Sequence, residues 1–182
     1  MITQETIAQA IGLIGLLLNV ISFQQKSKKA LITVQLLGSL VFSIHFLLLG
    51  AYTGFLLNFI GIGRATVYSN KEKFKADRIY WLLFFILLYI TTYILVFTLF
   101  GKEAVFKNFV VELLPIIGMV ISTISFRTKN ATTVRMLSLF NSPLWLIYNI
   151  FTKSIGGVLC EAMCLISIIV GIIRLDIKKK GA

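Results

Sequence analysis

The sequence predicts an all-α membrane protein in which seven transmembrane helices form two parallel three-helix repeats joined by a linker helix, a 3+1+3 order. Three observations predict this fold class: an apolar composition, seven long apolar runs, and an internal repeat at an offset of 103 residues. Of the 182 residues, 58% are hydrophobic and 14% are charged, and the mean hydropathy is +0.92. Soluble proteins average roughly 45–50% apolar and about 25% charged residues, so the expected solvent is lipid.

Each apolar run is long enough to cross roughly 30 Å of hydrocarbon at about 1.5 Å per helical residue. The N-terminal segment MITQET has no basic residue, and lysines follow the first run where a signal peptide would have a cleavage site, so this run is expected to remain as a helix. The predicted helices cover residues 7–23, 31–49, 54–70, 79–100, 109–126, 134–152 and 155–174.

Lysine and arginine residues are distributed unevenly between the two ends of these helices. Only Lys102, Lys107 and Lys153 lie on one predicted side of the membrane, whereas fifteen lie on the other. Because Lys and Arg near helix ends stay in the cytoplasm, the N-terminus is expected outside and the C-terminus inside. The fifteen are Lys26, Lys28, Lys29, Arg64, Lys71, Lys73, Lys75, Arg78, Arg127, Lys129, Arg135, Arg174, Lys178, Lys179 and Lys180.

The internal repeat aligns residues 14–65 with residues 117–168 without a gap and with eleven identities. Three helices per copy would invert the second copy, so one further crossing, the apolar run 79–100, is expected to restore its orientation. The domain boundaries follow: residues 1–75 form the first repeat, 76–102 the linker helix, and 103–182 the second repeat with a basic cytoplasmic tail. The glycine and serine matches are Gly15 with Gly118, Ser22 with Ser125, Ser39 with Ser142, and Gly54 with Gly157.

Residues 116–175, particularly LWLIYNIFTKSIGGVLCEAMCLISIIVGIIRL, resemble the three-helix unit of the SWEET, SemiSWEET and PQ-loop transporter superfamily. The full-length pattern is similar to the YgjV-like bacterial inner-membrane proteins. These resemblances imply a multi-pass protein of the bacterial inner (plasma) membrane with a transport function. The proline-glutamine pair of PQ-loop proteins is absent, because the first helices end in SFQQKSKK and SFRTKNAT, and a proline-based gate is not expected there.

The resemblance also implies a substrate-holding pair in each unit, formed by an aromatic residue on the second helix and a polar residue sixteen positions later on the third. The matching positions are Phe42 with Asn58 and Trp145 with Glu161. Counting about 1.5 Å per residue from the helix ends places Trp145 and Glu161 at similar depth in the outer half of the membrane. Because an ionised carboxylate in hydrocarbon costs several kcal/mol, Glu161 is expected to be protonated, paired or facing a watery cavity.

Each of these residues also has a structural interpretation. Glu161 and Asn58 are alternatively hydrogen-bonded between helices, and Phe42 and Trp145 are alternatively packing residues rather than a stacking surface for a solute. His45, one turn beyond the aromatic position, is either a proton relay or an interhelical hydrogen-bonding residue.

Two further predictions concern Asn141 and Glu112. Asn141 lies beside Pro143, where proline removes a backbone hydrogen bond, so this segment is either a hinge or a static kink. Glu112 is expected to be solvated or paired with Lys107.

Several classes of function are not expected. The net charge of +11 lies at helix ends rather than on one soluble face, so nucleic acid is not an expected partner. Cys160 and Cys164 lie in one apolar run and predict neither a disulfide framework nor a metal site. The acidic residues are scattered and only one histidine is present, so no enzyme activity and no cofactor are expected.

The sequence therefore predicts a facilitator or secondary transporter of a small polar, sugar-like solute that works by alternating access between the two units. The alternative is a non-transporting membrane receptor or regulatory protein on the same fold. The expected partners are membrane lipid and the small-molecule solute. A monomer would suffice because both units are on one chain, and a homo-oligomer is also compatible with the sequence.

Overall fold

The computed structural model describes residues 3–128 and 130–177, and every regular element within these ranges is a helix. A short helix, α4 (Lys71–Phe74), follows α3, and a π-helix, η1 (Ile172–Ile177), extends α8. All predicted spans agree with the long helices to within three residues at each end. The long helices are α1 (Gln4–Phe23), α2 (Lys28–Leu48), α3 (Tyr52–Ser69), α5 (Ile79–Thr98), α6 (Phe106–Arg127), α7 (Ala131–Phe151) and α8 (Ile155–Gly171).

Four of the long helices begin at a side-chain cap. Thr3, Ser27, Asn130 and Ser154 each accept a hydrogen bond from the backbone N–H three residues later. Such caps satisfy one of the free N–H groups of the first turn, which explains why α1, α2 and α7 begin before their apolar runs. Ser27 and Asn130 are 103 residues apart, so the second helix of each repeat starts at an equivalent cap.

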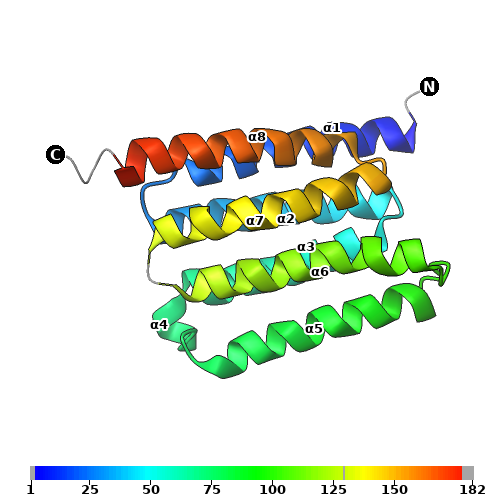
Figure 1. The fold of residues 1–182 in the computed structure, drawn as a ribbon, viewed down its shortest axis with the longest axis horizontal. Coiled ribbons are helices and arrows are strands. Elements are labelled where there is room, and N and C mark those ends of the chain that lie inside the picture. Colours follow the sequence, from blue (N-terminus) through cyan, green and yellow to red (C-terminus); the bar gives the residue numbers. More distant parts are fainter. Residues whose placement is uncertain (1–2, 129, 178–182) are drawn as a thin grey trace.

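The long helices form two three-helix layers with α5 along one edge (Figure 1). α2 lies between α1 and α3, and α7 lies between α6 and α8. The layers pack together with α1 against α8 and α3 against α6, so the first helix of each layer meets the third helix of the other. α5 packs along both α3 and α6. Figure 1 also shows that α1 begins and α8 ends at opposite ends of the bundle.

Glycines bring α1 and α8 close together. A Cβ atom added at Gly156 would lie 3.0 Å from the Cα of Gly12, so the two backbones are in direct contact. Small residues at such crossings allow the close van der Waals packing that holds membrane helices together. The equivalent pair, α3 and α6, packs less extensively.

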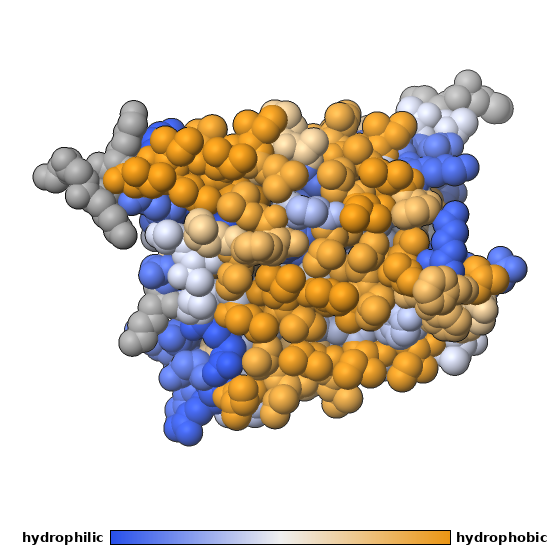
Figure 2. All heavy atoms as spheres, in the orientation of Figure 1, coloured by the Kyte–Doolittle hydropathy of each residue, from blue (hydrophilic) through white to orange (hydrophobic). Residues whose placement is uncertain are grey.

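The surface has the character expected of a membrane protein. Within the described residues, five helices are long and apolar enough to cross a membrane: α1, α2, α5, α6 and α8 with η1. Figure 2 shows a hydrophobic belt around the middle of the visible face, with hydrophilic residues gathered at the two ends of the helices. Large apolar side chains such as Leu87 on α5 and Phe59 on α3 are exposed on this surface. The prediction of an all-helical membrane chain is confirmed for the described residues.

Arg64 and Arg135 depart from the predicted charge distribution. Both were expected among the charges at the ends of the helices, but their side chains are buried within α3 and α7, with 7% and 1% exposure. Neighbouring helices provide acceptors for them, and the Arg135 guanidinium donates to the Phe23 carbonyl and to the Asp176 carboxylate. The uneven charge distribution is therefore carried by the other thirteen residues. Of these, Lys129 and the tail residues 178–180 lie outside the described residues.

The predicted partner of Glu112 is also corrected. Glu112 is buried, and its Oε1 atom lies 2.8 Å from Nζ of Lys102, not of Lys107. Lys107 instead places its ammonium group 4.9 Å from the centre of the Phe151 ring. Burial of the Glu112 carboxylate makes a close cationic partner necessary, and the loop before α6 brings Lys102 to it.

Candidate functional site

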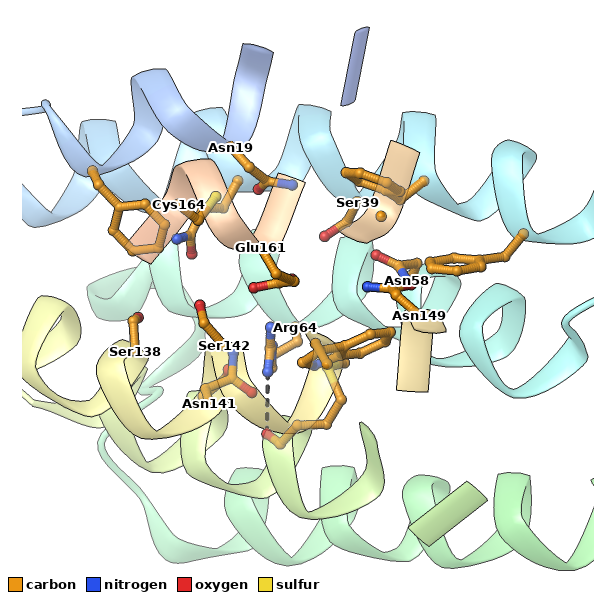
Figure 3. A pocket seen from close by; sticks show the side chains of 18 of the residues that line it. Asn19, Ser39, Asn58, Arg64, Ser138, Asn141, Ser142, Asn149, Glu161 and Cys164 are labelled. Atoms are coloured by element: carbon orange, nitrogen blue, oxygen red, sulfur yellow. Dashed lines mark hydrogen bonds between the residues drawn. The ribbon is translucent and has the colours of Figure 1, made fainter. Parts of the chain in front are cut away.

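A cavity of about 100 Å³ lies between the two layers, and all six helices of the layers contribute to its wall (Figure 3). Its lining is mainly polar on one side and aromatic on the other. The lining residues are Asn19 and Phe23 of α1; Gln35, Ser39, Phe42 and Phe46 of α2; Asn58 and Arg64 of α3; Met119, Ser122 and Phe126 of α6; Ser138, Asn141, Ser142, Trp145 and Asn149 of α7; and Gly157, Glu161 and Cys164 of α8.

Most of the lining residues occur in pairs separated by 103 positions. A cavity whose wall uses the same positions from both repeats lies where the two repeats meet, and both repeats contribute polar groups. Arg64 is one of five lining residues outside these pairs, because its equivalent, Ser167, does not line the cavity; the others are Met119, Asn141, Gly157 and Cys164. The pairs are Asn19 with Ser122, Phe23 with Phe126, Gln35 with Ser138, Ser39 with Ser142, Phe42 with Trp145, Phe46 with Asn149, and Asn58 with Glu161.

The structure brings together five of the six residues predicted to hold a solute. Phe42, Asn58, Asn141, Trp145 and Glu161 all line the cavity. Their ligand roles stay predictions, since the structure contains no ligand. The Asn58 side chain donates to the carbonyl of Gly54 in its own helix at 2.9 Å, which orients its amide.

The aromatic side of the cavity explains two of the repeated glycines. A Cβ atom at Gly15 would lie 2.7 Å from the Phe42 ring, and a Cβ atom at Gly118 would meet Oδ1 of Asn141 first and then Nε1 of Trp145 at 3.0 Å. Each glycine therefore leaves space on the first helix of its unit for the aromatic side chain of the second. Phe46 joins the two units, because its ring centre lies 6.1 Å from that of Trp145.

The two charged residues of the cavity come from opposite layers, Arg64 from α3 and Glu161 from α8. The Arg64 guanidinium donates to the Met119 carbonyl at 3.2 Å, the dashed line in Figure 3, and lies 4.6 Å from the centre of the Phe126 ring. Figure 3 shows the side chains of Glu161 and Arg64 in the same cavity. Within the described part of the chain, neither residue forms an ion pair.

His45 lies outside the cavity lining, in a hydrogen-bonded chain at one end of α1. Its Nδ1 atom is 2.6 Å from the Ala8 carbonyl oxygen, and its Nε2 atom is 2.7 Å from Oγ of Ser154, which also accepts from the Gly157 N–H. A neutral imidazole satisfies this chain when Nδ1 donates to Ala8 and Ser154 donates to Nε2. This geometry favours the structural interpretation of His45, which fastens α1, α2 and α8 together.

The Asn141 side chain makes no hydrogen bond to the backbone group left free by Pro143. Its Oδ1 atom is buried without a partner among the described residues, and α7 continues through Pro143 to Phe151. This oxygen packs against Gly118 of α6, so Asn141 does not repair the helix.

A second cavity, of about 360 Å³, lies near the loop before α6. Thr53, Lys102 and Glu112 line it, and Thr53 and Glu112 each have a buried oxygen without a hydrogen-bond partner in the described ranges. Lys102 already occupies the other carboxylate oxygen of Glu112. No group of three or more His, Cys, Asp or Glu residues within residues 3–128 and 130–177 is arranged to hold a metal ion.

Sequence reasoning missed Arg64 as a cavity residue, although a signal was present. Arg64 falls inside the predicted run 54–70, six residues after Asn58, and an arginine inside an apolar helix marks a candidate functional site by itself. Asn19, Gln35, Ser138 and Asn149 were also missed. Their hydrophilic side chains gave no such signal, because serine and amide residues also occur on packing faces of membrane helices.

Comparisons with known proteins agree with a membrane protein. The family described as "Imp-YgjV: Bacterial inner membrane protein" matches residues 6–179. The protein "Inner membrane protein YgjV" of Escherichia coli (strain K12) is 26% identical over 181 residues, which cover 98% of this chain and 90% of that protein. No solved structure matches the chain. The predicted resemblance to YgjV-like proteins is therefore confirmed.

Proposed function

The chain belongs to the Imp-YgjV family of bacterial inner membrane proteins, and on this premise we propose that it is a facilitator or secondary transporter of a small polar solute. One observation carries the proposal: a polar cavity at the meeting point of the two repeats, lined by equivalent positions of both. Transporters built from parallel repeats hold their solute in this place, near the membrane midplane.

The proposal includes a topology of seven crossings, with the N-terminus outside and two parallel three-helix units around the linker helix α5. The opposite positions of the start of α1 and the end of α8 support it, as do the basic residues gathered at one end of the helices. α3 and α7 are less apolar than the other long helices because they contribute Arg64, Asn141 and other polar residues to the cavity. A helix that lines a polar cavity does not need an apolar face all round.

Alternating access would proceed by relative movement of the two layers. The cavity measures about 100 Å³. A hexose needs more room than this, so a sugar-like solute would require a wider state than this one. Solutes of a few heavy atoms fit without that change.

Osmotic swelling of proteoliposomes tests the transport proposal. Purified protein is reconstituted, and shrinkage and recovery are followed by light scattering after addition of glycerol, glucose or glycine. At least one of these probes is expected to enter faster than in protein-free vesicles. The variant Ser39→Phe fills the cavity and is expected to abolish the added flux.

The matched control is Leu40→Phe, which adds the same ring at the neighbouring exposed position of α2. Equal loss of flux in both variants would contradict the proposal, because the loss would not depend on the cavity. Saturable binding of a probe without flux would support the alternative, a non-transporting receptor.

A further inference from the structure

The two charged side chains of the cavity have no oppositely charged partner among the described residues. Arg64 is 7% exposed, and its guanidinium is held only by neutral groups: the Met119 carbonyl, the Thr123 hydroxyl at 3.4 Å, and the Phe126 ring. Its Nε atom is buried without a hydrogen-bond partner among the described residues. A buried cation without an anionic partner costs several kcal/mol, so this site is strongly biased toward binding an anionic group.

The opposite wall carries the complementary charge. Glu161 faces the same cavity from α8 and, among the described residues, takes part in neither of the ion pairs, which are Lys102 with Glu112 and Arg135 with Asp176. Glu161 and Arg64 both line the cavity but do not form an ion pair with each other. A guanidinium pairs best with a carboxylate, and a carboxylate pairs with an ammonium group.

The charge of the solute can be argued by elimination. With Glu161 ionised, a neutral polyol would hydrogen-bond to both residues but leave both charges uncompensated. In the same state, a solute with only a carboxylate would satisfy Arg64 and meet the like charge of Glu161, and an amine alone would have the reverse difficulty. We infer that the cavity binds a zwitterion, a small amino acid whose carboxylate pairs with Arg64 and whose ammonium group pairs with Glu161.

The remaining lining fits the rest of such a molecule. Met119 and Trp145 give an apolar wall for a short side chain. The volume of about 100 Å³ restricts that side chain to a small one. The distance between the Arg64 guanidinium and the Glu161 carboxylate determines whether the site prefers α-amino acids, such as alanine, or longer ω-amino acids, such as β-alanine. Binding of a zwitterion in the cavity does not depend on the proposed function. Only its movement across the membrane rests on that proposal.

Calorimetric titration of the purified full chain in detergent tests the inference. The probes are alanine, β-alanine, propionate, ethylamine and glycerol. Wild type is expected to bind alanine or β-alanine at least ten-fold more tightly than propionate, ethylamine or glycerol. An equal or higher affinity for glycerol would overturn the inference, and this comparison needs no variant.

Two substitutions then assign the groups. Glu161→Gln is expected to weaken amino acid binding at least ten-fold without weakening that of propionate. Arg64→Gln is expected to weaken the amino acid equally without weakening ethylamine, and Arg64→Lys, which keeps the charge, is expected to retain part of the affinity. Lys73→Gln, at an exposed position of α4, is the control with unchanged affinities. A uniform loss for all probes in folded variants would overturn the assignment.

The test separates the two proposals. Amino acid binding without flux in proteoliposomes would contradict transport and leave the zwitterion site standing. Flux of glycerol or glucose without any preference for the amino acids would contradict the zwitterion site and leave transport standing.

Discussion

The backbone carbonyls of Phe23 and Phe126, which are equivalent positions of the two repeats, each accept a hydrogen bond from a basic side chain of the opposite unit. Nζ of Lys28 on α2 donates to Phe126, and Nε of Arg135 on α7 donates to Phe23 at 3.1 Å. Carbonyls at helix ends lack partners within their own helix, and a cation there is favourable. Both phenylalanines line the cavity, so the two crossed tethers hold its wall at the end where α1 and α6 finish.

Loss of the Lys28 tether is expected to open this end of the cavity. In Lys28→Gln, the labelling rate of the cavity cysteine Cys164 by a maleimide should increase several-fold over wild type, because one of two restraints on the wall is gone. Labelling is followed by mass spectrometry, and Cys164→Ser identifies the site. Lys29→Gln, an exposed neighbour, is the control. An unchanged rate in Lys28→Gln would argue against a restraining role of the tether.

The glycines beneath the aromatic residues are expected to tolerate no side chain. Gly15→Ala and Gly118→Ala should each lower stability by about 1–3 kcal/mol, since the added methyl group meets Phe42 or Trp145 in a packed core. Gly63→Ala on α3 is the control, because open space surrounds it, and it should raise stability by up to about 1 kcal/mol. Thermal unfolding in detergent measures all three. The same shift at all three positions would refute this account.

His45 is expected to act in stability rather than in transport. His45→Phe removes the hydrogen bonds of the ring to the Ala8 carbonyl and to the Ser154 hydroxyl, at a cost of about 1–3 kcal/mol. Its unfolding temperature should fall, whereas the flux of the folded variant in proteoliposomes, measured well below that temperature, should stay close to wild type. A large loss of flux in a variant of undiminished stability would instead support the proton-relay interpretation.

The buried carboxylate of Glu112 is expected to depend on Lys102. A hydrogen bond to a charged group contributes about 1.5–3 kcal/mol. Because the lysine side chain is 39% exposed, Lys102→Gln should lower stability by an amount near the lower end of this range. Lys107→Gln is the matched control and should have the smaller effect, because Lys107 contacts the Phe151 ring. Chemical or thermal unfolding of both variants gives the comparison. A larger effect in Lys107→Gln would restore the pairing expected from the sequence.

Helix positions and the repeat were accessible to sequence reasoning because both depend on local information. Apolar runs predict helices in lipid, where backbone groups must be satisfied within the helix, and the observed ends differ from the prediction by at most three residues. The resemblance to the transporter superfamily pointed to Trp145 and Glu161, and the fixed offset of 103 residues carried these positions to Phe42 and Asn58; all four line one cavity. His45 was placed with them because it lies one turn away on α2, but its side chain points to α1 and α8 instead.

By itself, the sequence determined that the chain is helical, apolar and internally repeated, since hydropathy and identity at a fixed spacing are properties of the chain alone. Only the tertiary structure decided that Arg64 turns into the cavity rather than toward the ends of the helices, and that Lys102 rather than Lys107 neutralises Glu112. The physical reason is that a charged side chain can be buried only where other helices supply its partners. Those partners, such as the Met119 carbonyl beside Arg64, are far away in the sequence.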